Sequence, residues 1–234
     1  MSYDYHDAAM DEAYDRLSEE LYPEHKAQAI IDFTYERLRS YYVQHKDLLV
    51  PAVRTYKLAE SLLAANHPSA ALVFSVSAVE LFLKACLLRP VVAGLVHSES
   101  VADLVVESSL SQTGFKRYEK LLAGLFKELM RVEIGTIERQ GGSRPLLEEA
   151  SQLQDRRNAV VHRGEEIATD EARRAFAVAR AVFNEVLAPV LLELGLSVQM
   201  GGQLVDNEGS TAAPGAIPPT ADETSTLSGR NLES

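Results

Sequence analysis

The chain has 234 residues, of which 46% are hydrophobic and 24% are charged, a composition typical of a globular protein with a sizeable buried core. Its single cysteine, Cys86, excludes an internal disulfide and favours a reducing compartment. The net charge of −11 lies at the two ends, with −7 in residues 1–24, −4 in residues 197–234 and zero between them. An acidic total therefore does not exclude an RNA-binding patch on the balanced middle.

Two helices are predicted at the N-terminus. Apolar residues recur at helical spacing over 7–21 and again over 25–49, and Pro23 marks a break between them. Acidic residues stand where a signal peptide would have its basic start, and no apolar run follows them. We therefore expect residues 1–49 to form an N-terminal helical arm, in a protein that is cytoplasmic and does not enter a membrane.

A further helix is predicted to open at Pro51, and the most apolar helix of the chain follows it. The segment Ser69 to Leu88, "SAALVFSVSAVELFLKACLL", is apolar on nearly every side, which is typical of a central helix covered by others. Arg89-Pro90 is expected to end it. Because Glu80 and Lys84 lie within this run, and a bilayer rarely accepts two charges, we interpret it as a core helix rather than a membrane span.

The rest of the chain is also mainly helical by pattern. Helical spacing predicts helices over 115–131, over 145–163 and over 169–194. Small and polar residues dominate the end of the chain, so residues 197–234 are predicted to form a disordered tail. No stretch alternates cleanly between apolar and polar residues. The predicted fold class is therefore all-α, with a helical bundle over residues 50–196.

The stretch "DRRNAVVHRG", Asp155 to Gly164, places arginines, an asparagine and a histidine at one helix end. An arginine followed by a histidine after four to six intervening residues is a weak signal, since roughly one match is expected by chance among sixteen arginines and six histidines. Arg39-SYYVQ-His45 fits the same spacing. The context is more specific, because Arg157 and His162 lie just before a glycine stop, an acidic loop and one final amphipathic helix.

This ensemble resembles the HEPN superfamily of small α-helical bundle proteins. Their signature is an arginine, commonly followed by Asn, Asp or His, and then a histidine near the final helix. "SAVELFLKACL" resembles the family's early helix and "LQDRRNAVVHRGEEIATDEARRAFAVARAVF" its last third, so the resemblance covers residues 50–195. It implies a metal-independent endoribonuclease without a cofactor, acting as a homodimer whose two motifs face each other.

The same resemblance implies a biological setting. Many HEPN proteins are toxins or effectors in toxin–antitoxin and defence systems, so an antitoxin or an activating sensor protein is an expected partner, and single-stranded RNA or a tRNA loop an expected substrate. One subgroup has a tyrosine two residues after the histidine. Gly164 stands there in this chain, so regulation through such a tyrosine is not expected.

The residue types suit RNA cleavage. A histidine titrates near neutral pH and can remove a proton from the 2′-hydroxyl or protonate the leaving 5′-oxygen, which leaves a 2′,3′-cyclic phosphate. An arginine can pair with two oxygens of the phosphorane. On a regular helix Asn158 shares a face with His162 and is expected to orient the imidazole, whereas Arg157 lies roughly 140° away. Arg157 must therefore reach round the helix, follow an early helix end, or serve the histidine of a second copy. Because one histidine cannot easily be both base and acid, a site shared between two copies of the chain is favoured.

Plainer roles remain open for the same residues. The plain role for His162 is a helix-end histidine bonded to a carbonyl. Glu80 is costly to bury alone and is expected to pair with Lys84 or with an arginine of the motif, which makes Arg157 a structural ion-pair partner. Arg156 and Arg163 are surface charges or contacts to an RNA backbone. The alternative function is a catalytically silent HEPN-like module that dimerises and docks a partner protein or nucleic acid, and a weaker one is a nucleotide-binding bundle. No metal site is predicted, because the histidines and Cys86 do not cluster at ligand spacing.

Overall fold

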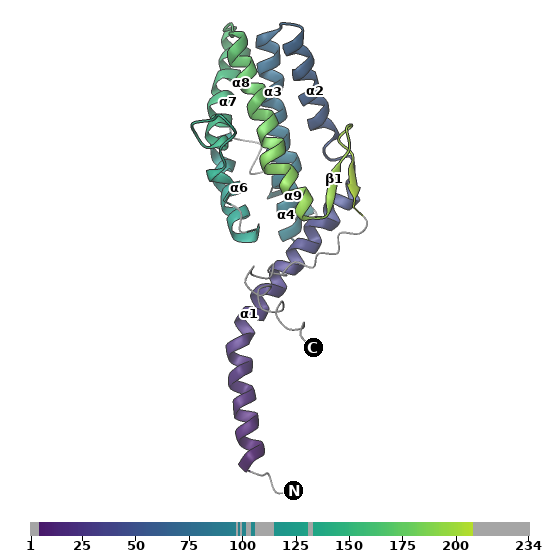
Figure 1. Cartoon of the computed structure of the whole chain (residues 1–234), viewed down its shortest axis with the longest axis vertical. Helices are drawn as coiled ribbons and strands as arrows, with labels where there is room; N and C mark the ends of the chain where they lie inside the picture. Colours follow the sequence, from purple (N-terminus) through teal and green to yellow (C-terminus); the bar gives the residue numbers. More distant parts are fainter. Residues whose placement is uncertain are drawn as a thin grey trace, which may run out of the picture.

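The computed structural model describes residues 5–96, 98, 100, 101, 104, 105, 115–130 and 133–207, and it is mainly helical, as predicted. The elements are α1 (Tyr5–Gln44), α2 (Val50–Ala64), α3 (Pro68–Leu83), α4 (Arg89–Leu95), α6 (Phe115–Met130), α7 (Leu146–Arg163), α8 (Thr169–Ala181), α9 (Ala188–Glu193), β1 (Leu196–Val198) and β2 (Leu204–Asp206). Helices α2, α3, α7 and α8 lie side by side in an elongated bundle (Figure 1). The N-terminal half of α1 projects from the opposite end of that bundle to the α2–α3 and α7–α8 turns.

Helix α1 is one continuous element of 40 residues, so the predicted break at Pro23 is wrong. A proline removes one main-chain hydrogen bond, and the remaining bonds of a long helix can carry the chain through it. The C-terminal part of α1 belongs to the bundle, because Leu38 and Tyr42 are buried in its core. The predicted arm, residues 1–49, is therefore separate from the bundle only in its N-terminal half.

The apolar helix does not end at Arg89-Pro90, as the sequence suggested, but continues as α4 to Leu95. A π-helical turn over Lys84–Leu88 makes this possible, with the N–H of Arg89 donating to the Lys84 carbonyl five residues back. Pro90 has no N–H for the Cys86 carbonyl, and the buried hydroxyl of Tyr42 donates to that carbonyl instead. A tyrosine from another helix thus satisfies the main-chain group that the proline leaves open.

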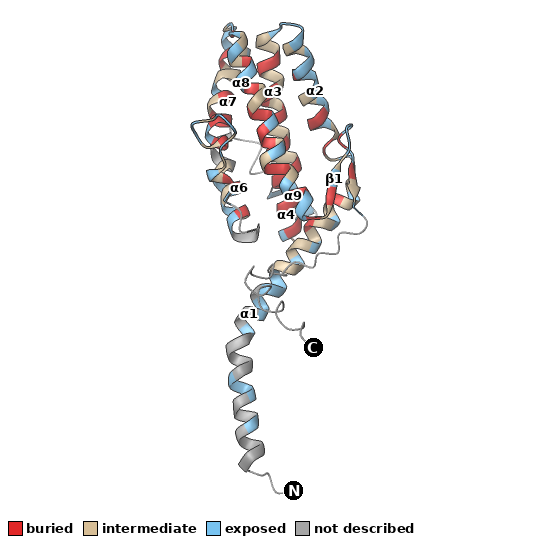
Figure 2. Ribbon diagram, viewed as in Figure 1, coloured by how far each residue is buried: buried red, intermediate tan, exposed pale blue. Residues whose placement is uncertain are grey.

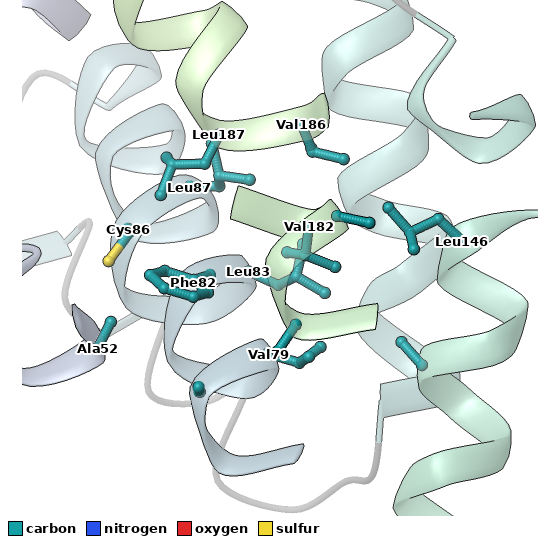
Figure 3. Packing of buried hydrophobic residues seen from close by; sticks show 14 of the residues in the cluster. Ala52, Val79, Phe82, Leu83, Cys86, Leu87, Leu146, Val182, Val186 and Leu187 are labelled. Atoms are coloured by element: carbon teal, nitrogen blue, oxygen red, sulfur yellow. The ribbon is translucent and has the colours of Figure 1, made fainter. Parts of the chain in front are cut away.

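The second central helix repeats this arrangement. A π-helical turn over Val182–Leu187 joins α8 to α9, and the N–H of Ala188 donates to the Phe183 carbonyl just before Pro189. The two π-helical segments contribute to one hydrophobic core (Figure 3), which includes Phe82, Leu83, Cys86, Leu87, Val182, Val186 and Leu187. Burial raises the pKa of the Cys86 thiol to about 12, as expected for an unreactive core cysteine. Figure 2 shows that buried residues line the inner faces of these helices.

Two helical stretches, Pro68–Leu95 and Thr169–Glu193, are long and apolar enough to cross a membrane if judged by length and composition alone. In the bundle, 61% and 50% of their most apolar windows are buried. A core helix of a soluble protein passes the same test. Their burial agrees with the interpretation of residues 69–88 as a core helix.

A short β-hairpin follows α9, so the predicted disordered tail, 197–234, is wrong over its first residues. Strands β1 and β2 pair antiparallel, with Ser197 opposite Val205. Arg39 of α1 holds the hairpin through two hydrogen bonds to the Asp206 carboxylate, at 2.6 and 2.7 Å. The strands have three residues each, too short to show the alternation that predicts a strand. Residues 208–234 lie outside the described residues.

Candidate active site at the end of helix α7

Arg157 lies on the face of α7 that packs against α3, and its guanidinium is already bonded there. Its Nη2 lies 3.4 Å from Oε2 of Glu80, and its Nη1 donates to Oδ1 of Asn158 at 3.1 Å. The other carboxylate oxygen of Glu80 accepts a 2.7 Å hydrogen bond from Gln154. The side chains of Arg157 and Glu80 are 27% and 18% exposed. Of the two partners that the sequence left open for Glu80, Lys84 or an arginine of the motif, the arginine pair is therefore formed.

The other two arginines of the stretch pair with the loop and helix that follow. Arg156 donates to Glu171 at 2.5 and 3.1 Å and to Glu165 at 2.8 Å, and Arg163 also donates to Glu165 at 2.8 Å. The hydrogen bonds and charge of Glu171, followed by those of Glu165, raise the pKa of the Arg156 guanidinium above its ordinary value. These pairs fasten the end of α7 to the start of α8.

His162 lies in the last turn of α7 and is exposed. Gly164 ends the helix in the left-handed conformation, at φ 67°, and its N–H donates to the Val160 carbonyl. Within the described part of the chain His162 makes no hydrogen bond or ion pair. The expected contact of Asn158 with the imidazole is not formed among the described residues, and the Oδ1 of Asn158 accepts a hydrogen bond from Arg157. One chain therefore holds the guanidinium and leaves the imidazole open to solvent.

The second match to the spacing, Arg39 and His45, is occupied by structural contacts. Arg39 pairs with Asp206, and Nδ1 of His45 lies 2.8 Å from the Tyr41 carbonyl, with the two rings stacked at a centroid distance of 4.2 Å. Arg39 joins α1 to the hairpin, and His45 contacts the last turn of α1 itself. The interpretation of this pair as a chance match agrees with these contacts, and the pair provides an internal control for experiments on Arg157 and His162.

A second charged cluster, which the sequence did not indicate, lies at the other end of α7. Glu149 is 2% exposed and accepts hydrogen bonds from Arg139 at 2.6 Å and from Arg174 at 3.1 Å. Burial alone raises the pKa of this carboxyl, but the two arginines outweigh burial and hold the pKa below its ordinary value. Because Arg139 precedes α7 and Arg174 lies in α8, no local spacing could have indicated the cluster.

No family model, characterised protein or solved structure matches this chain. The resemblance to HEPN proteins consequently depends on the quoted residues alone. Among the residues that the structure describes, no three His, Cys, Asp or Glu side chains are grouped so as to hold a metal ion. What the site offers chemically is an exposed imidazole and, on the same helix, three arginines that each have a carboxylate partner.

Proposed function

We propose that this protein is a metal-independent RNA endonuclease of HEPN type whose active site forms between two copies of the chain in the cytoplasm. The observation that carries the proposal is the contrast at the end of α7. His162 is exposed with no partner in the described chain, while Arg157, five residues earlier, is held by Glu80 and Asn158. A second copy that brings its own α7 to this surface supplies another imidazole and another guanidinium.

The chemistry divides naturally between two copies. One His162 imidazole removes the proton of an RNA 2′-hydroxyl, whose oxygen attacks the adjacent phosphorus. The partner's His162 protonates the 5′-oxygen as its bond to phosphorus breaks, leaving a 2′,3′-cyclic phosphate and a 5′-hydroxyl. Arg157 then pairs with the phosphorane oxygens. A toxin or defence effector of this kind would be restrained by an antitoxin or an activating sensor until needed.

The test is cleavage of total RNA by the full-length protein in EDTA. His162→Ala is expected to abolish cleavage while leaving the circular dichroism spectrum and the thermal unfolding midpoint unchanged, because the imidazole is exposed and makes no described contact. His45→Ala is the matched control, since it belongs to the other arginine–histidine spacing and should leave cleavage intact. Cleavage that survives in His162→Ala would contradict the proposal.

A mixing experiment tests the two-copy site. If both histidines act on one phosphate, a mixed dimer with one His162→Ala subunit is inactive, so excess variant suppresses cleavage by wild-type subunits. Dilution with an unrelated protein does not. Wild-type activity per subunit that is indifferent to added variant would show that one chain acts alone.

A second function is favoured by a specific observation, namely that Arg156, Arg157 and Arg163 all have carboxylate partners. These pairs suit a catalytically silent module that docks a partner through the same surface. Absence of cleavage by the wild-type protein, together with dimer formation, would favour this module over the nuclease.

A further inference from the structure

Helix α1 carries two apolar stretches that share one seven-residue register. Positions alternately four and three residues apart run from 10 to 42, and eight of these ten positions are apolar or aromatic. The first four positions, here called the arm stretch, are Met10, Tyr14, Leu17 and Leu21, and the last four, called the anchored stretch, are Ile31, Tyr35, Leu38 and Tyr42. Glu24 and Gln28 occupy the two positions between them. The same pattern therefore occurs twice on one helix.

The anchored stretch is packed on the bundle. Leu38 is 4% exposed and Tyr42 is completely buried, with its hydroxyl on the Cys86 carbonyl. Tyr35 packs against the core and donates its hydroxyl to the Glu193 carbonyl. In this half of α1, the residues at the register positions form the face that packs against the bundle.

The arm stretch has the same register, and the structure describes two of its side chains, those of Met10 and Tyr14. The N-terminal half of α1 extends beyond the bundle (Figure 1), and Met10 and Tyr14 are 64% and 75% exposed. A helix that packs against nothing has only marginal stability in water, and most helical stability in proteins comes from burying an apolar face. Covering the arm stretch would stabilise this part of α1.

The charge of the N-terminal part of α1 indicates which class of partner can bind the arm stretch. Residues 1–24 contain eight acidic residues and one basic residue, and the positions that flank the arm stretch include Asp11 and Glu20. A second copy of the arm would bring acids against acids, as would residues 208–234, which hold four acids and one base. Nucleic acid and anionic membranes are repelled for the same reason.

We propose that the arm stretch binds a basic amphipathic helix of another protein, with apolar side chains on the register positions and lysine or arginine beside them. The apolar face gives the affinity, and the acidic flanks select the partner. This interaction is independent of the proposed nuclease site, which lies at the opposite end of the bundle.

The test uses the full-length protein and two synthetic peptides of about three heptads each. One has leucine at every register position and lysine at the flanking positions, and the other has the same composition with the register scrambled. Fluorescence anisotropy is expected to show a Kd about tenfold lower for the registered peptide than for the scrambled one. Equal binding of the two peptides would mean that charge alone acts, and would overturn the proposal.

Variants then locate the site. Tyr14→Asp is expected to remove the preference for the registered peptide, and Glu20→Lys to weaken binding of both peptides. Leu192→Asp is the matched control, because Leu192 is 69% exposed but lies on α9, away from the arm. Unchanged preference in Tyr14→Asp would overturn the proposal. So would sedimentation showing a wild-type dimer that Tyr14→Asp dissociates, since the occupant would then be a second copy.

Discussion

The two ends of helix α7 carry the same residue types in different surroundings. At its N-terminal end, Glu149 is buried between Arg139 and Arg174. At its C-terminal end, the side chains of Arg156, Glu165 and Glu171 are 39%, 36% and 29% exposed, and an exposed histidine follows. A buried carboxylate cannot lose its partners without a large desolvation cost, whereas exposed pairs can exchange partners with water or a ligand. The first cluster is therefore suited to holding the fold, and the second to binding.

The largest effect is expected from removing the buried carboxylate. Glu149→Ala leaves two arginines without their shared partner, and breaking a buried ion pair in this way costs on the order of 3 kcal/mol of unfolding free energy. The measurement is urea unfolding followed by circular dichroism. The control is Glu148→Ala next to it, whose 3.6 Å pair with Arg144 is half exposed and contributes less than about 1 kcal/mol. Equal losses in the two variants would show that the buried cluster stabilises the fold no more than the exposed pair does.

Acid should weaken the same end of the helix. The folded state holds the pKa of Glu149 below its ordinary value of 4.5, so its contribution to stability is complete above that pH and is lost as the pH falls through the folded pKa. Urea unfolding of wild type and Glu149→Gln should therefore differ most near neutral pH. The difference should shrink in acid. A difference that is constant with pH would show that the carboxylate charge is not what stabilises the cluster.

Some of this arrangement could be predicted from the sequence because its causes are local. The helical period of apolar residues indicated most of the helices, and a lone acid on an apolar helix indicated that Glu80 needs a cationic partner, which is Arg157. The stop at Gly164 was also predictable, since a glycine directly after the last helical turn readily adopts the left-handed conformation.

The remaining features depend on residues far apart in the chain. Where the helix passes Pro90, Tyr42, 44 residues before Cys86, donates to the carbonyl that the proline leaves open. Glu149 takes partners 10 and 25 residues away, on different elements. The spacing of Arg157 and His162 could be read from the sequence. Their different surroundings could not, because Arg157 pairs with Glu80 of α3, far away in the chain, while His162 is exposed. Local patterns carry no information on such pairings.

A smaller loss of stability is expected from neutralising Glu80. Glu80→Gln keeps the shape of the side chain but removes the charge that faces Arg157, and hydrogen bonds to charged groups contribute about 1.5 kcal/mol. Urea unfolding should show a loss of this order. Arg163→Gln is the control, because its side chain is 68% exposed and its loss should change stability little. If the two variants unfold alike, the Arg157–Glu80 pair is no more important to the fold than a surface pair.

The smallest effect is expected at the turn that ends α7. Gly164 has φ +67° and open space where a Cβ would stand, so Gly164→Ala meets no clash and its cost is conformational, about 1 kcal/mol. Gly201→Ala is the control, because that position is equally open and lacks a positive φ. Stability should fall only in the first variant, as measured by thermal unfolding.

The two glycine variants also bear on the proposed chemistry. Alanine at 164 favours one more residue of right-handed helix, which redirects the chain directly after His162 and alters how the imidazole and the Glu165 loop are presented. RNA cleavage should then fall in Gly164→Ala by more than its small loss of stability explains, and should stay unchanged in Gly201→Ala. If Gly164→Ala cleaves RNA as well as wild type while its stability falls, the turn supports the helix alone, and the position of His162 does not depend on it.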